Sequence, residues 1–134
     1  MKLYQAIRLE KSLSDELNKL HNRFRSNNCI SVNELRDYEP NVLLEEIKKK
    51  TDELIRIGFL IEKSKMNIRE IVLRNTEYEK TLETLRSTPT SMSKDSINAF
   101  TRTELDKIIT EYENKIKINK DSIDYYEFIT DVDI

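Results

Sequence analysis

The sequence predicts an all-α protein, an elongated antiparallel coiled coil in which three principal helices form long helical hairpins. Three observations carry this prediction. Apolar residues recur in alternating steps of three and four over residues 43–85, which is the heptad pattern of a coiled coil. Only one Gly and two Pro occur in 134 residues, so few turns are available. Charged residues make up 36% of the chain and apolar ones 37%, a balance typical of long helices.

The first helix is expected over residues 2–26. Its apolar residues keep the heptad spacing: Leu13, Leu17, Leu20 and Phe24. The polar run at 26–28 should end it, because Asn tolerates turn geometry and competes for backbone groups. A long connector is expected to follow up to Pro40, which disfavours helix at the residue before it. Asn41 is a candidate N-cap for the next helix.

The central helix is expected over residues 41–86. One of its two core heptad positions is held by Ile47, Leu54, Ile61, Ile68 and Leu82. Preserved heptad phase favours an unbroken helix, since a turn has no reason to keep register. The alternative is a turn at 64–67, because Asn67 and Glu70 have the spacing of a capping box.

A second apolar stripe lies opposite this seam. It consists of Ile55, Phe59, Met66 and Leu73, at spacings of four and seven. A helix that is apolar on two sides is covered on two sides. Gly58 costs about 1 kcal/mol in a helix interior relative to Ala, which is easier to understand if another helix crosses closely there. We expect this region to form an oligomer contact, in a homodimer or a tetramer; the alternative is cover by a helix of the same chain.

A Ser/Thr-rich loop with Pro89 is expected to reverse the chain between residues 87 and 100. Thr101 and Glu104 then open a last helix over 101–129, which can lie antiparallel along the second half of the central helix, as the first helix can along the first half. The five residues after Ile129 are expected to fray. The chain is thus expected to be one elongated domain, 1–134.

Two asparagines fall on core heptad positions, Asn75 and Asn119. A single polar residue in such a seam can fix the register of the helices at a cost in stability. We expect this register-setting role for Asn75, because intact apolar positions flank it. The alternative is that each Asn faces water.

The net charge is −2, so no strong field attracts the whole molecule to nucleic acid. The first helix is nevertheless basic, and a Lys run follows at 48–50. A nucleic-acid-associated protein is therefore an alternative function, and its phosphate contacts would be Arg8, Lys11, Lys19, Arg23, Arg25, Lys48, Lys49 and Lys50. Interleaved acidic residues dilute this basic stripe.

Catalysis is not expected. His21 and Cys29 are the only His and Cys, so no metal-ligand cluster forms from them, and Cys29 is expected to fill a small apolar space in the connector. A single Gly cannot build a phosphate-binding loop, and no cofactor site is expected. The single Cys, the lack of a secretion signal and the lack of a long apolar run predict a cytoplasmic protein without a membrane span.

Several segments of the chain resemble one known family. They are Met1-Lys2-Leu3 with Ala6-Ile7, the leucines up to Leu20, Arg23 with Asn27, Glu39-Pro40 followed by Leu43-Leu44, and Ile123-Asp124-Tyr125-Tyr126. Together they are similar to the septicolysin-like family of small bacterial coiled-coil proteins, whose biochemical role is unassigned. The family has an Asn-Trp pair near its end, whereas this chain has no Trp. The resemblance implies an elongated, oligomeric helical protein.

The sequence therefore favours a non-catalytic scaffold that self-associates and binds a protein partner of unknown identity. The nucleic-acid function is the main alternative. A pore-forming role is a third one, implied only by the name of the similar family, and no motif in the sequence supports it.

Overall fold

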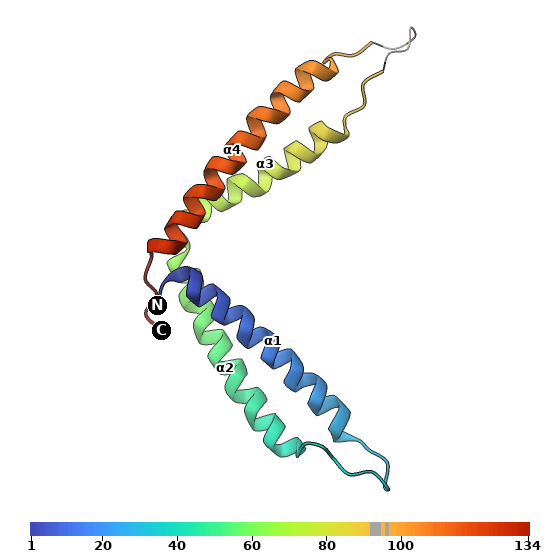
Figure 1. The fold of residues 1–134 in the computed structure, drawn as a ribbon, viewed down its shortest axis with the longest axis vertical. Helices are drawn as coiled ribbons and strands as arrows, with labels where there is room; N and C mark the ends of the chain where they lie inside the picture. The colour runs from blue at the N-terminus through green and yellow to red at the C-terminus, as the bar shows by residue number, and fades with distance from the viewer. Residues whose placement is uncertain (92–94, 96) are drawn as a thin grey trace. The chain divides into compact units, whose positions relative to one another are not determined.

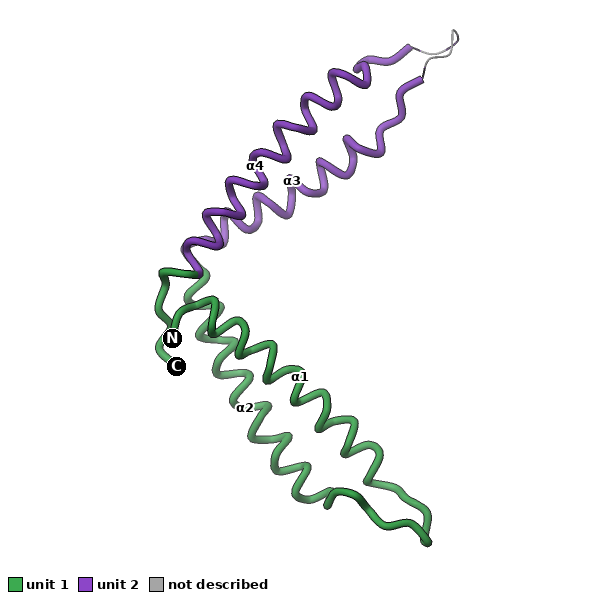
Figure 2. Tube along the Cα trace, in the orientation of Figure 1, with its two compact units in different colours: residues 1–66, 128–134 green, residues 67–127 purple. Residues whose placement is uncertain are grey.

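The computed structural model describes residues 1–91, 95 and 97–134. They form α1 (Leu3–Asn28), α2 (Pro40–Ser64), the 3₁₀ turn η1 (Met66–Ile68), α3 (Arg69–Ser87) and α4 (Arg102–Ile129), as Figure 1 shows. The all-α class is confirmed. The chain forms two compact units, drawn in separate colours in Figure 2: unit 1 contains residues 1–66 and 128–134, and unit 2 contains residues 67–127. A single domain over 1–134 stays a prediction.

The prediction of an unbroken central helix over residues 41–86 is wrong. α2 ends at Ser64, and the backbone N–H of Lys65 donates to the carbonyls of Ile61 (3.0 Å) and Glu62 (3.2 Å). The bond to Glu62 spans three residues, which is the 3₁₀ pattern common at helix ends. The three-residue turn η1 follows before α3 starts. Heptad phase survives such a break, because a short 3₁₀ piece still advances the chain by about one turn.

The alternative of a turn near residues 64–67 is therefore correct, although the capping box expected there does not form. Ile68 occupies the N-cap of α3 and makes no side-chain capping bond. The amide Nδ2 of Asn67 instead donates to the Tyr126 hydroxyl at 3.5 Å. Both residues belong to unit 2.

The remaining helix boundaries lie close to the predicted ones. α2 starts at Pro40 with Glu39 as its N-cap, so the prediction that Asn41 caps this helix is wrong. Proline suits the first helical position because its φ is already helical and its missing N–H is not needed there. Thr101 does cap α4, since its Oγ1 accepts the backbone N–H of Glu104 at 3.2 Å. Part of the loop predicted at 87–100 lies outside the described residues.

Unit 1 is an antiparallel hairpin of α1 and α2 (Figure 1). Its seam is the predicted heptad seam, with these buried residues: Leu3, Ala6, Leu13, Leu17, Leu20, Leu43, Ile57 and Ile61. An ion pair joins the two helices, Lys50 Nζ to a Glu16 carboxylate oxygen at 2.9 Å. The hydrogen bond and the charge of Glu16 raise the pKa of Lys50 above its ordinary value of 10.5.

Unit 2 pairs α3 with α4, also antiparallel (Figure 1). A small apolar cluster holds the pair, formed by Leu82, Ile109 and Ile116 with Tyr78, Leu85 and Tyr112 packed against it. Tyr78 and Tyr112 meet edge to face with centroids 5.7 Å apart. The ammonium of Lys115 lies 5.2 Å from the centroid of Tyr112, a cation–π distance. The two halves of the predicted central helix thus each have their own partner helix.

The tail at residues 130–134 is ordered, so the prediction that it frays is wrong. The N–H of Leu3 donates to the Thr130 carbonyl and the N–H of Val132 donates to the Met1 carbonyl, each at 2.7 Å. These bonds flank an isolated antiparallel bridge. The Val132 side chain is buried, as is that of Leu3. We call this pairing of both chain ends the terminal clasp.

The terminal clasp is expected to loosen in acid. Lys2 Nζ lies 2.9 Å from a carboxylate oxygen of Asp131, and its hydrogen bond and charge hold the pKa of Asp131 below the ordinary 3.8. A carboxyl group whose pKa is lower in the folded state than in the unfolded state stabilises the folded state at pH values above the unfolded-state pKa. This stabilisation is lost as the pH falls through the folded-state pKa. The protection factor of the Val132 amide, which is its intrinsic exchange rate divided by the rate measured by NMR, should therefore be constant from pH 7 to about 4 and fall below about pH 4.

Asp131→Asn serves as the control, because its side chain does not titrate. We expect the Val132 amide of this variant to show no acid-dependent change beyond the intrinsic exchange rate. A wild-type chain with the same profile as Asp131→Asn would contradict the assignment.

Candidate functional site

An apolar face of unit 1 points away from its own hairpin. Ile55, Phe59 and Met66 are 65%, 69% and 70% exposed, although all are large apolar residues. The buried residues Ile57 and Ile61 lie on the opposite side of the helix, because two residues advance a helix by about 200°. We call Ile55, Phe59 and Met66 the outer stripe. Among the described residues of unit 1, no helix covers it.

Two other residues predicted for this contact lie elsewhere. Leu73 is on α3 in unit 2, where its side chain is exposed. Gly58 faces the hairpin seam: a Cβ added there would lie 3.1 Å from Oε2 of Glu10 on α1. The close neighbour of Gly58 is thus the end of a side chain from the same chain, and this contact does not cover the outer stripe.

Gly58→Ala is expected to stabilise unit 1 by about 0.5–1 kcal/mol, the usual helix-propensity gain. The contacting carboxylate ends a flexible, partly exposed side chain, so it can move a few tenths of an ångström to admit a methyl group. Urea unfolding followed by circular dichroism measures the change. Gly58→Leu is the control and should destabilise, because a larger side chain forces α1 away. A lower stability of Gly58→Ala would contradict a movable Glu10.

Asn75 lies inside unit 2, with only 7% of its surface exposed. Its Nδ2 donates to the Ile116 carbonyl at 3.2 Å, and its Oδ1 accepts from Asn119 Nδ2 at 2.8 Å. The two asparagines predicted on core positions therefore meet across the α3–α4 seam. Each hydrogen bond can form in only one axial alignment of α3 with α4. This is the geometry that a register-setting pair requires.

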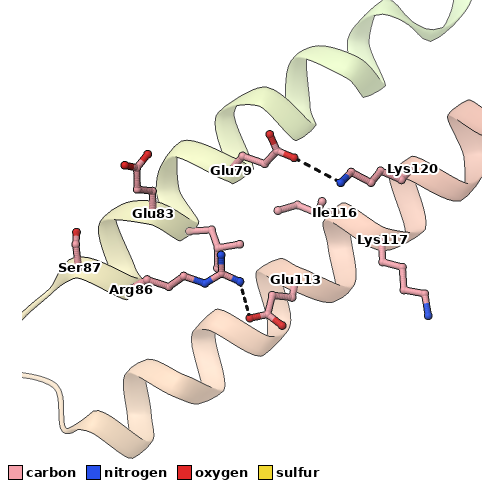
Figure 3. Close-up of a pocket in the computed structure, with 9 residues that line it drawn as sticks. Glu79, Glu83, Arg86, Ser87, Glu113, Ile116, Lys117 and Lys120 are labelled. Carbon is pink, nitrogen blue, oxygen red and sulfur yellow. Dashed lines mark hydrogen bonds and ion pairs between the residues drawn. The ribbon is translucent and has the colours of Figure 1, made fainter.

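A groove of about 790 Å³ lies between α3 and α4 (Figure 3). Leu82 and Ile116 line it together with charged residues of both signs. Two ion pairs cross it: Arg86 to Glu113 at 3.0 Å and Lys120 to Glu79 at 3.9 Å. Three acidic and three basic residues line the groove, so their charges balance.

The basic residues proposed for phosphate contacts are partly engaged within the chain. Lys48 and Lys50 pair with glutamates, while Arg8 and Arg23 lie over the rings of Tyr4 and Tyr38. The other four make no ion pair with the described residues: Lys11, Lys19, Arg25 and Lys49. Acidic side chains lie among them, so these residues form no continuous basic surface. The nucleic-acid function stays a prediction.

Comparisons with known proteins identify no relative of this chain. No protein family, curated protein or solved structure matches the chain. The septicolysin-like resemblance therefore stays a prediction. Within the described part of the chain, no group of three His, Cys, Asp or Glu side chains could hold a metal ion, and no helix has the length and apolar character needed to cross a membrane.

Sequence reasoning missed one polar residue of structural importance, Asn27. It is buried, and its carboxamide holds the connector between α1 and α2. The polar run at 26–28 predicts the end of the first helix and does not identify this anchoring role. An Asn on the heptad spacing of Leu20 and Phe24, directly before a long connector, could have indicated an inward-facing cap.

Proposed function

We propose that the chain is a non-catalytic helical scaffold that self-associates through the outer stripe and presents its hairpins to a protein partner. The exposure of Ile55 and Phe59 on one face of α2, with the exposed Met66 just past the end of that helix, carries the proposal. Contiguous exposed apolar patches typically mark interaction sites, and the hairpin seam already buries the other side of α2. Homodimers commonly bury such a patch against a second copy.

Phe59→Glu is expected to weaken self-association by at least about thirtyfold. The change removes a large apolar contact worth about 2 kcal/mol and places a carboxylate where water is excluded. Light scattering at a fixed concentration should show an oligomer for the wild-type chain and a 16.0 kDa monomer for the variant. Circular dichroism should be unchanged, because Phe59 does not contribute to the buried seam.

Ile118→Glu is the matched control. Ile118 is a similarly exposed apolar residue on α4 and lies outside the outer stripe. We expect this variant to keep the wild-type mass. An oligomer that survives Phe59→Glu while remaining sensitive to Ile118→Glu would place the contact on unit 2 instead.

A further inference from the structure

The connector between α1 and α2, residues 29–39, is a fixed loop rather than a loose linker. We call it the tip loop. The Asn27 Oδ1 accepts the backbone N–H groups of Asp37 (3.1 Å) and Tyr38 (3.3 Å). The Arg36 guanidinium donates from Nε to the Asn27 carbonyl at 2.8 Å and from Nη2 to the Asn28 carbonyl at 3.2 Å. These bonds fasten the second half of the loop to the end of α1.

Two further contacts hold the tip loop. The N–H of Glu34 donates to the Ser31 carbonyl at 3.0 Å, which closes a turn. The guanidinium of Arg23 lies 4.9 Å from the ring centroid of Tyr38, a cation–π distance. The second half of the tip loop is therefore held to the end of α1 before any partner binds, which lowers the entropic cost of binding there.

This ordered backbone holds two apolar side chains out in water. Leu35 is 93% exposed and Val32 is fully exposed. Val32 lies inside the turn closed by Ser31 and Glu34, and Leu35 directly follows that turn, so the two exposed side chains are close along the loop. A linker does not need exposed aliphatic side chains, whereas a loop that binds a partner does. A held loop that exposes neighbouring aliphatic side chains is therefore a suitable recognition element.

The charged groups of the tip loop that are not engaged by the described residues are negative. Its only cation, Arg36, is directed at backbone carbonyls, whereas Glu34, Asp37 and Glu39 make no ion pair with the described residues. These carboxylates disfavour an approach to nucleic acid or to anionic lipid. They favour an apolar surface with basic side chains beside it.

The outer stripe is an apolar surface with basic side chains beside it. Arg56 and Lys63 are seven residues apart and flank Phe59 on the same edge of the helix. Neither makes an ion pair with the described residues. The opposite edge carries the acidic Glu62, and Asp52 lies one turn before Arg56 on the same edge, so the basic part of this edge is the stretch from Arg56 to Lys63 beside Phe59 and the tip loop would lie toward it.

We propose that the tip loop of one copy binds the outer stripe of a second copy, with Val32 and Leu35 against Ile55 and Phe59 and the loop carboxylates beside Arg56 and Lys63. The same chain cannot make this contact, because Ile55 lies about 22 Å along α2 from Pro40 at about 1.5 Å per residue. This inference rests on the proposed self-association and names the occupant of the outer stripe.

The single exposed cysteine allows a direct test in the full chain. Cys29 lies at the start of the tip loop, where it is exposed rather than filling an apolar space as the sequence suggested. The unlabelled chain would carry benzophenone-maleimide on Cys29 and be mixed with a ¹⁵N-labelled Cys29→Ser copy, irradiated and digested. We expect cross-links to ¹⁵N peptides that contain residues 55–66. Cross-linked dimers joined at other segments would overturn the proposal.

Variants separate this inference from the proposed function. Val32→Ser with Leu35→Ser should weaken self-association about tenfold or more, by removing two apolar contacts. Arg56→Glu should weaken it a few fold, and Glu34→Arg in the same chain should recover most of that loss. An oligomer that Phe59→Glu dissociates and the loop variants leave unchanged would overturn the loop contact alone. A wild-type chain that is monomeric throughout would overturn both proposals.

Discussion

Ile57→Ala is expected to destabilise unit 1 by about 2–5 kcal/mol, the range found when a buried aliphatic side chain is truncated. Ile57 is fully buried in the α1–α2 seam. The loss of stability has two parts. One is the hydrophobic free energy of the groups that are removed, and the other is the cost of the cavity that remains in the seam. Because both helices are held mainly by this thin seam, little else can compensate.

Ile55→Ala is the matched control, two residues away on the same helix. Its side chain is mostly exposed, so we expect the free energy of unfolding to change by no more than about 0.5 kcal/mol. Both variants would be unfolded in urea in the Phe59→Glu background, so that assembly makes no contribution. Equal losses at the two positions would contradict the assignment of one face to the seam and the other to the outer stripe.

Asn75→Ala is expected to cost unit 2 about 1–3 kcal/mol. The change leaves the Nδ2 of Asn119 without its 2.8 Å partner inside the α3–α4 seam. An unpaired polar group in a seam costs more than the net value of the bond it made. Urea unfolding gives the loss, and Thr76→Ala on the exposed side of α3 should change the stability by about 0.5 kcal/mol or less.

The pair of asparagines should behave as one unit. Replacing both Asn75 and Asn119 with Leu should cost less than the sum of the two single changes, with a coupling energy of about 0.5–3 kcal/mol. An apolar pair leaves no unsatisfied amide, and it also removes the contact that requires one register. Strictly additive losses would contradict a register-setting pair.

The heptad pattern predicted the helices and their buried faces well, because periodic apolar residues have one physical solution in water. Leu13, Leu17 and Ile61 are buried as the spacing requires. The break after Ser64 was harder to predict, since a short 3₁₀ turn costs little and leaves the heptad phase intact. Asn75 and Asn119 were placed correctly on core positions by the same spacing.

Long-range pairing could not be predicted from local pattern. The terminal clasp joins Lys2 to Asp131, and a bridge between chain ends has no sequence period. The anchoring of the tip loop by Asn27 likewise depends on where the backbone of Asp37 lies after folding. The sequence predicted the outer stripe as an apolar face. The residue that contacts Gly58 could be identified only in the structure.

Sedimentation equilibrium of the wild-type chain tests the central claim most directly. Self-association through the outer stripe predicts an average mass that rises above 16.0 kDa with concentration and approaches a multiple of it. Phe59→Glu should remain at the monomer mass over the same range. A wild-type chain that stays at 16.0 kDa up to high micromolar concentration would contradict the claim.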